Sequence, residues 1–322
     1  MNLKKLIFRG KQFGGLRLFI AYLRLGVGRI LFGQLLKVVR GKATLNEAYA
    51  EIRKYVNRTL QARYADFLIA RKEYYDRQSL EQVHSKKVWT CWLQGFDAAP
   101  ELVKVCQASL KRYLVDREII QLTEENYKSY ITLPDYIINR YDKGQIPPAL
   151  FSDLLRLEVL IRYGGTWMDA SILCTGDGYP RELLDCDLFM FQALRKGDRR
   201  FYGTSNWFIT ACSGNRLLMV LRDVLYKYWK DYSCTLNYYM FHDFFYKIGT
   251  MYPQEIEAMP RRNRRIPLML MERLGDTYDQ PWMEELLKHC WFHKLCWRVR
   301  DDAISNPDSF YHHIIEVSQA QL

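Results

Sequence analysis

Three charged side chains in one short stretch of the chain are suited to bind an anionic ligand together. Asp153 and Arg156 lie three residues apart in a predicted helix, so both point to the same face. Asp169 ends a short apolar run, which places its carboxylate at the end of a predicted strand. A carboxylate there can hold a divalent cation, and a guanidinium can hold a phosphate or ribose oxygen. A structural role is the alternative, since helical Asp–Arg pairs and strand-end aspartates are common.

A helix, a glycine turn and a strand must position these residues. The pattern predicts a helix over 149–163, which Gly164 and Gly165 end. We expect the two glycines also to let backbone approach a ligand closely. A strand over 166–169 then delivers Asp169 to its carboxyl end, where open α/β sheets bind their ligands.

The body around this stretch alternates short apolar runs with helical patterns, which predicts an α/β fold with helices flanking a sheet. A first strand is expected to begin at Val88 and to end before Gly95. Strand–helix–strand order after it favours parallel pairing. Further elements are expected as a helix over 100–114, strands at 118–122, 187–192 and 206–212, and helices near 215–230, 235–248 and 281–289.

Positive charge is concentrated at the N-terminus. The net charge is +11, and residues 1–42 hold ten Lys and Arg with no Asp or Glu, so the remaining 280 residues carry only +1. The longest apolar run, Leu18 to Leu23, is far shorter than the roughly 18 residues that span a bilayer. We expect an amphipathic segment on an anionic membrane surface, broken into short helices at Gly26, Gly28 and Gly33. A helix packed on the enzyme body is the alternative.

This charge distribution argues against a nucleic-acid-binding protein, whose cations should line the folded body that meets phosphate. The eight cysteines form no CxxC pair and no zinc-ligand spacing, so we expect reduced core residues in a cytosolic protein. The predicted segments are a membrane-associating segment over 1–42, a helical extension over 43–83, a catalytic domain over 84–300 and a C-terminal tail over 301–322. Thr44 and Glu47 form a capping box that opens the extension.

The run S-D-L-L-R-L-x-x-L-x-x-Y-G-G-T-W-M-D-A-S over 152–171 resembles a known signature. It is similar to that of capsular polysaccharide synthesis glycosyltransferases, the mannosyltransferase-like sugar-binding DXD family and the large glucosylating toxins. The segments 89–95, 205–215 and 293–295 extend the resemblance over roughly 86–297. It implies a GT-A-like, Rossmann-like mixed sheet that transfers a hexose, with retention, from a UDP-sugar to a lipid-linked oligosaccharide at the cytoplasmic face of the membrane.

The resemblance also implies roles for individual residues. Asp153 and Arg156 would grip the donor sugar, and Asp169 would contact ribose and a metal. Asn206 would lie beside the transferred sugar, and Trp92 would stack near the nucleotide base. The remaining nucleotide-sugar-binding residues implied in this way are Gly164, Gly165, Ser171 and Lys294.

One position departs from the family pattern. Ser171 stands where the DXD motif has a second carboxylate, and a hydroxyl is a weaker ligand of Mg²⁺ or Mn²⁺. The implied divalent cation therefore has a weaker site, a replacement ligand such as His293, or assistance from Lys294 as a fixed cation. A catalytically reduced sugar-binding or scaffold protein is the alternative function.

A second polar point lies in an aromatic run. His242 and Asp243 follow Tyr238, Tyr239 and Phe241, and an aromatic helix suits the faces of acceptor sugars. A core helix with one satisfied histidine is the alternative.

Overall fold

The computed structural model describes residues 15–194, 201 and 203–319, and it forms two compact units. The first comprises the described part of Met1–Ser79 together with Thr132–Leu155 and Arg216–Tyr252. The second comprises Leu80–Ile131, Arg156–Asn215 and the described part of Pro253–Leu322. Helix α9 (Pro148–Tyr163) contributes residues to both units, so the two are interleaved along the sequence.

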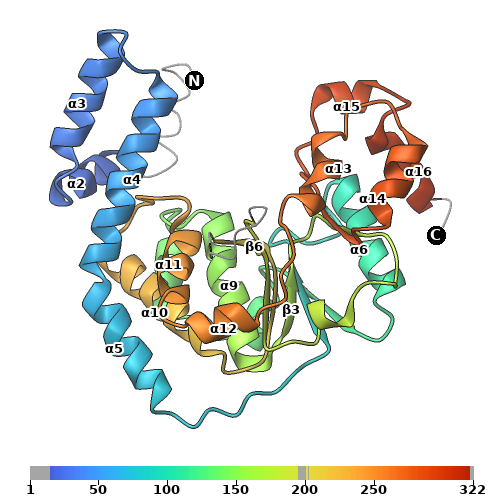
Figure 1. Cartoon of the computed structure of the whole chain (residues 1–322), viewed down its shortest axis with the longest axis horizontal. Coiled ribbons are helices and arrows are strands. Elements are labelled where there is room, and N and C mark those ends of the chain that lie inside the picture. The colour runs from blue at the N-terminus through green and yellow to red at the C-terminus, as the bar shows by residue number, and fades with distance from the viewer. Residues whose placement is uncertain (1–14, 195–200, 202, 320–322) are drawn as a thin grey trace. The chain divides into compact units, whose positions relative to one another are not determined.

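The first unit is helical (Figure 1). Helix α4 begins at the predicted capping box, where the Glu47 amide donates to Thr44 Oγ1 and the Thr44 amide donates back to the Glu47 carboxylate. On α5, Tyr75 and Arg71 bind Asp223 of α10 at 2.8 and 2.5 Å. The helices that lie wholly within this unit are α2 (Leu16–Arg24), α3 (Gly28–Val39), α4 (Leu45–Arg63), α5 (Ala65–Asp76), α8 (Asp135–Asp142), α10 (Arg216–Asp231) and α11 (Met240–Gly249).

The described part of the basic N-terminal segment forms two short helices, as its glycines predicted. Gly26, with φ 72°, lies in the break between α2 and α3, whereas Gly33 lies inside α3. Among the described residues no single helix has the length and hydropathy to cross a membrane; α2 and α3 pass that test only together, with a bend of 113°. The cations of residues 1–14 lie outside the described residues.

The second unit contains a five-stranded mixed sheet of order β2-β1-β3-β6-β5 (Figure 1). Its strands are β1 (Lys87–Cys91), β2 (Glu118–Leu122), β3 (Gly165–Met168), β5 (Leu188–Gln192) and β6 (Thr204–Ala211). Strand β1 pairs with β2 and β3 in parallel, and β6 pairs with β3 and β5 in antiparallel orientation. The expected α/β class with a mixed sheet and an N-terminal helical extension is therefore confirmed.

A second, two-stranded sheet pairs β4 (Ile172–Cys174) with β7 (Phe292–Lys294). These strands have only three residues each, too few for an alternating pattern to reveal them in the sequence. The pairing places Lys294 opposite Ile172, immediately after the predicted site turn.

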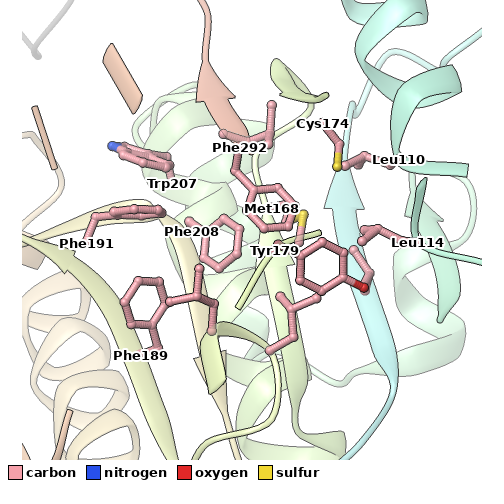
Figure 2. Packing of buried hydrophobic residues seen from close by; sticks show 14 residues of the cluster. Leu110, Leu114, Met168, Cys174, Tyr179, Phe189, Phe191, Trp207, Phe208 and Phe292 are labelled. Atoms are coloured by element: carbon pink, nitrogen blue, oxygen red, sulfur yellow. The ribbon is translucent and has the colours of Figure 1, made fainter. Parts of the chain in front are cut away.

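The core of this unit is largely aromatic (Figure 2). Phe191 of β5 stacks on Trp207 of β6 at 4.9 Å between ring centroids, and Phe208 lies 5.0 Å from Phe292 of β7. Burial of each such side chain contributes about 1.5–3 kcal/mol, so this cluster holds both sheets together. The other labelled members are Leu110, Leu114, Met168, Cys174, Tyr179 and Phe189.

The helices of the second unit are α6 (Glu101–Tyr113), α7 (Tyr127–Tyr130), α12 (Pro253–Ala258), α13 (Met269–Glu272), α14 (Gln280–Leu287), α15 (Asp301–Ser305) and α16 (Phe310–Gln319), with 3₁₀ turns at Arg181–Leu183 and Ile266–Leu268. Phe310 and Ile314 of α16 are buried in a cluster with Val105 and Cys106 of α6. The segment expected as a tail is thus packed against this unit, because a few apolar residues in it form one helical face.

Candidate active site

The site lies at the carboxyl ends of β1 and β3. These strands are parallel neighbours, with Trp89 opposite Trp167, so the residues that follow them meet at one edge of the sheet. After β3 the chain turns at once, and the amide of Ile172 donates to the carbonyl of Asp169 at 2.9 Å. This turn places Asp169 and Ser171 close together. Asp169 follows the carboxyl end of its strand, as the sequence predicted.

Three donors hold the Asp169 carboxylate. Arg156 Nη2 lies 3.2 Å and Trp167 Nε1 lies 3.0 Å from Oδ1, and Lys294 Nζ lies 3.1 Å from Oδ2. Trp167 and Asp169 share a face because side chains two apart in an extended strand point the same way. The structure therefore brings Arg156, Asp169 and Lys294 together, and it fixes the orientation of the carboxylate.

The electrostatics keep Asp169 ionised. Burial alone would raise the pKa of Asp169, but the charges of Lys294 and Arg156 and the hydrogen bonds from Trp167 and Lys294 lower it below its ordinary value. The Arg156 side chain is 4% exposed, whereas Lys294 is 21% and Asp169 27% exposed. The two cationic side chains provide N–H donors beside the carboxylate, and such donors suit a phosphate ligand.

Ser171 connects the turn to β7. Lys294 Nζ donates to Ser171 Oγ at 2.7 Å, and the Ser171 hydroxyl donates to the carbonyl of Leu295 at 2.8 Å. The backbone of the turn has its own support, since Gln107 Nε2 of α6 donates to the carbonyl of Ala170 at 3.0 Å. Ser171 therefore fixes the lysine as well as the turn.

Sequence reasoning missed Trp167 and Gln107. The signal for Trp167 is its place two residues before Asp169 in a strand, which implies a shared face. Gln107 gives no such signal, because its role depends on where α6 packs against the turn.

Trp92 and Asn206 border this turn. Trp92 packs against a buried cluster that includes Ala170, and its ring lies 5.4 Å from that of Trp297 in an edge-to-face contact. Asn206 precedes Trp207, whose carbonyl accepts from the Asp169 amide at 2.9 Å. The last pair of the antiparallel register of β3 and β6 is Met168 with Phe208, two residues after Asn206 on β6. Both predicted positions thus lie next to the turn.

The two glycines follow the end of α9 at Tyr163, as expected, but their close backbone approach is not to a ligand. Gly164 and Gly165 stand at the start of β3, whereas Asp169 follows its other end. A Cβ at Gly165 would lie 2.3 Å from the carbonyl oxygen of Lys87, and φ is 96° there. The close approach that requires glycine is therefore to the backbone of β1, which corrects the ligand-binding interpretation.

His293 does not join Asp169. Its ring is fully buried, Nε2 lies 3.2 Å from Thr175 Oγ1, and burial lowers its pKa to about 4. Consecutive strand residues point to opposite faces, so His293 points away from the side that carries Lys294 to Asp169. The proposal of His293 as a replacement metal ligand is corrected on this ground.

The donor set does not fit a divalent cation. Within the described ranges no three His, Cys, Asp or Glu side chains gather in a group that could hold a metal ion. Asp169 already binds two cationic side chains, and Ser171 is engaged by Lys294. Mg²⁺ is commonly bound by one or two carboxylates together with substrate phosphates, and the carboxylate at this turn is already paired with two cationic side chains.

Asp153, His242 and Asp243 belong to the first unit. Asp153 is buried one helical turn before Arg156 on α9. The Asp243 carboxylate accepts from Asn237 Nδ2 at 2.5 Å, and burial raises its pKa above the ordinary value. Their proposed roles toward the donor and the acceptor stay predictions.

The fold is a mixed α/β sheet with a charged cluster at the carboxyl ends of two parallel strands, the edge at which open α/β sheets bind their ligands. Residues 38–314 match the model of the family described as capsular polysaccharide synthesis protein, and the chain belongs to that family. A solved structure titled "PaToxG Glycosyltransferase" is 14% identical over 83% of this chain and 98% of its own, with a TM-score of 0.40. No curated protein matches the sequence.

Proposed function

We propose that this enzyme transfers a hexose from a UDP-sugar to a lipid-linked oligosaccharide in the synthesis of a capsular or other surface polysaccharide. The observation that carries the proposal is the Asp169 carboxylate held by Arg156 and Lys294 at the carboxyl ends of parallel strands. Such an edge is where open α/β sheets bind nucleotides, and the two cationic side chains suit a diphosphate. Family membership supports the polysaccharide product.

The exposure of each side chain suggests which part of the nucleotide sugar it contacts. Asp169 reaches the surface and can accept hydrogen bonds from ribose or sugar hydroxyls, whereas Arg156 lies behind it. Arg156 is therefore proposed to position the carboxylate rather than to touch the sugar. Trp92 offers a ring near the turn for the base, and Asn206 is proposed to contact the transferred hexose.

We place the acceptor along α11 of the first unit. Tyr238, Tyr239 and Tyr246 are exposed there, and the Arg53 guanidinium lies 4.9 Å from the centroid of the Tyr239 ring. Exposed rings of this kind bind the flat faces of sugars. Asp243 and His242 of the same helix would supply polar contacts to acceptor hydroxyls.

We further propose peripheral attachment to an anionic membrane at its cytoplasmic face. Leu16, Phe19 and Leu23 of α2 and Phe32 and Val39 of α3 have exposed side chains, although they are large and apolar. The cations of the same helices can reach anionic head groups while these side chains enter the acyl boundary.

The donor is identified by incubating the purified full-length protein with a panel of UDP-, GDP-, ADP- and CMP-sugars and measuring the unfolding temperature. A UDP-hexose is expected to stabilise the protein, by about 2.7 kcal/mol when its concentration is a hundred times its Kd. The same donor should lose its hexose to a lipid extract that contains the acceptor. A protein that neither binds nor consumes any nucleotide diphosphate sugar would contradict the proposal and favour a sugar-binding or scaffold protein.

The proposal includes retention of the anomeric configuration. Proton NMR of the purified product reads this directly from the anomeric coupling. An inverted linkage would contradict the proposed retention and leave the proposed hexose transfer standing.

A further inference from the structure

We propose that Lys294 supplies the positive charge that a divalent cation supplies in DXD sites, so that this transferase binds and cleaves its donor without a metal. The inference rests on the proposed function. It concerns the cation that faces the leaving diphosphate.

The position of the lysine carries the argument. Lys294 Nζ lies 3.1 Å from Asp169 Oδ2 and 2.7 Å from Ser171 Oγ, which are the first and third residues of the turn after β3. These are the oxygens that would have to bind a metal at this turn. The ammonium therefore occupies the cation position between them.

The surrounding charges favour an ammonium over a metal ion. Asp169 is shared by Lys294 and by Arg156, whose Nη2 lies 3.2 Å from Oδ1. A divalent cation in the same place would be repelled by both cationic side chains. The Ser171 hydroxyl donates a hydrogen bond to the Leu295 carbonyl and accepts one from Lys294, so both contacts hold its oxygen beside the ammonium.

The fold keeps Lys294 in this position. The antiparallel pair of β4 and β7 sets Lys294 opposite Ile172, and the Leu295 amide donates to the Ser171 carbonyl at 2.9 Å. A flexible side chain held by its backbone and by two hydrogen bonds needs little reorganisation during the reaction.

The ammonium has the capacity for a ligand. It carries three donors, of which Asp169 and Ser171 use two, and its side chain is 21% exposed. The third can bind an oxygen of the donor's β-phosphate. When the bond from that oxygen to the anomeric carbon breaks, its electron pair stays on the phosphate beside Lys294. The acceptor oxygen bonds to the anomeric carbon, and its proton passes to the departing UDP or to solvent.

The test measures UDP binding to the full-length protein by titration calorimetry, once with EDTA and once with Mn²⁺. The wild type is expected to bind UDP with affinities that agree within about threefold in the two conditions. Lys294→Met should bind at least about tenfold more weakly, and Lys294→Arg, which keeps the charge, should retain part of the affinity. Lys288→Met is the matched control, since Lys288 is exposed and pairs with Glu285.

The outcomes separate the inference from the proposed function. UDP binding that EDTA abolishes and Mn²⁺ restores would overturn the lysine's role and leave the transferase proposal standing. Unchanged UDP affinity in a folded Lys294→Met protein would do the same. Absence of UDP binding in both conditions would overturn both proposals. Thermal unfolding of each variant, with Lys294→Arg as the charge-preserving reference, separates loss of the ammonium from loss of folding.

Discussion

At the scale of single residues, the site depends on one ionised carboxylate between two cations. Arg156 and Trp167 fix Oδ1 of Asp169, and Lys294 binds Oδ2, so the carboxylate has a single orientation toward a ligand. Because its pKa is below the ordinary value, this arrangement holds at neutral pH and is lost only in acid.

The sequence could predict Asp169 and Arg156 but not this pairing with Lys294. The first two lie within one helix–turn–strand unit, whose spacing brings them together. Lys294 is 123 residues from Ser171, and only the pairing of β4 with β7 joins them. His293 was assigned to the metal because the order of residues in a three-residue strand does not reveal which side chain faces the site.

His293 makes a pH-dependent contribution to stability. Its pKa is lowered from 6.5 to about 4 by burial, so the folded protein keeps it neutral while the unfolded chain takes up a proton below pH 6.5. The free energy of unfolding should fall from this cause by up to about 3 kcal/mol as the pH drops from 6.5 to 4. His293→Gln, which cannot titrate, should lack this part of the loss.

Urea unfolding at pH 7, 5.5 and 4.5 measures the effect. His289→Gln is the control, because His289 is an exposed histidine of the same unit and should keep the wild-type pH dependence. Equal pH dependence in wild type and His293→Gln would refute the assignment.

At the scale of elements, local patterns located most helices and strands. The capping box of Thr44 and Glu47 starts α4 as expected, and the helix over 149–163 is α9 with one more residue at its start. Local patterns could not show tertiary contacts. Gly164 and Gly165 were expected to let the backbone approach a ligand, yet Gly165 is required because the backbone of β1 at Lys87 lies too close for a Cβ.

The two N-terminal helices have a packed face and an exposed apolar face. Ala21, Leu25 and Val27 are buried, and Tyr22 donates to the Leu236 carbonyl at 3.4 Å, so one face packs on the first unit. The exposed face carries Phe19 and Leu23. Packing and membrane contact are therefore compatible, each on its own side.

Removal of residues 2–42 should release the protein from membranes. Cosedimentation with vesicles containing phosphatidylglycerol is expected to fall at least about tenfold, because both the apolar insertion and the attraction to lipid charge are lost. Phe19→Asp with Leu23→Asp should weaken binding in the full-length protein, whereas Ile69→Asp, at an exposed apolar residue of α5, should not. Membrane binding that survives the deletion would end the anchoring proposal.

At the scale of the whole molecule, the α/β class and the mixed sheet could be predicted because strands and helices have strong local periodicities. The interleaving of two compact units could not be predicted, because it depends on contacts between segments that are distant in the sequence, such as that of Tyr75 with Asp223. The packing of α16 on α6 was missed for the same reason. Family membership adds the polysaccharide context, which no single contact provides.

The most direct test of the central claim is the rate of hexose transfer by Asp169→Asn. The amide keeps the shape of the side chain but removes the charge that orients Lys294 and Arg156, so we expect at least about a hundredfold lower kcat with little change in unfolding temperature. Asp177→Asn, at an exposed aspartate beyond β4, should transfer normally. A folded Asp169→Asn protein that transfers hexose at the wild-type rate would contradict the account.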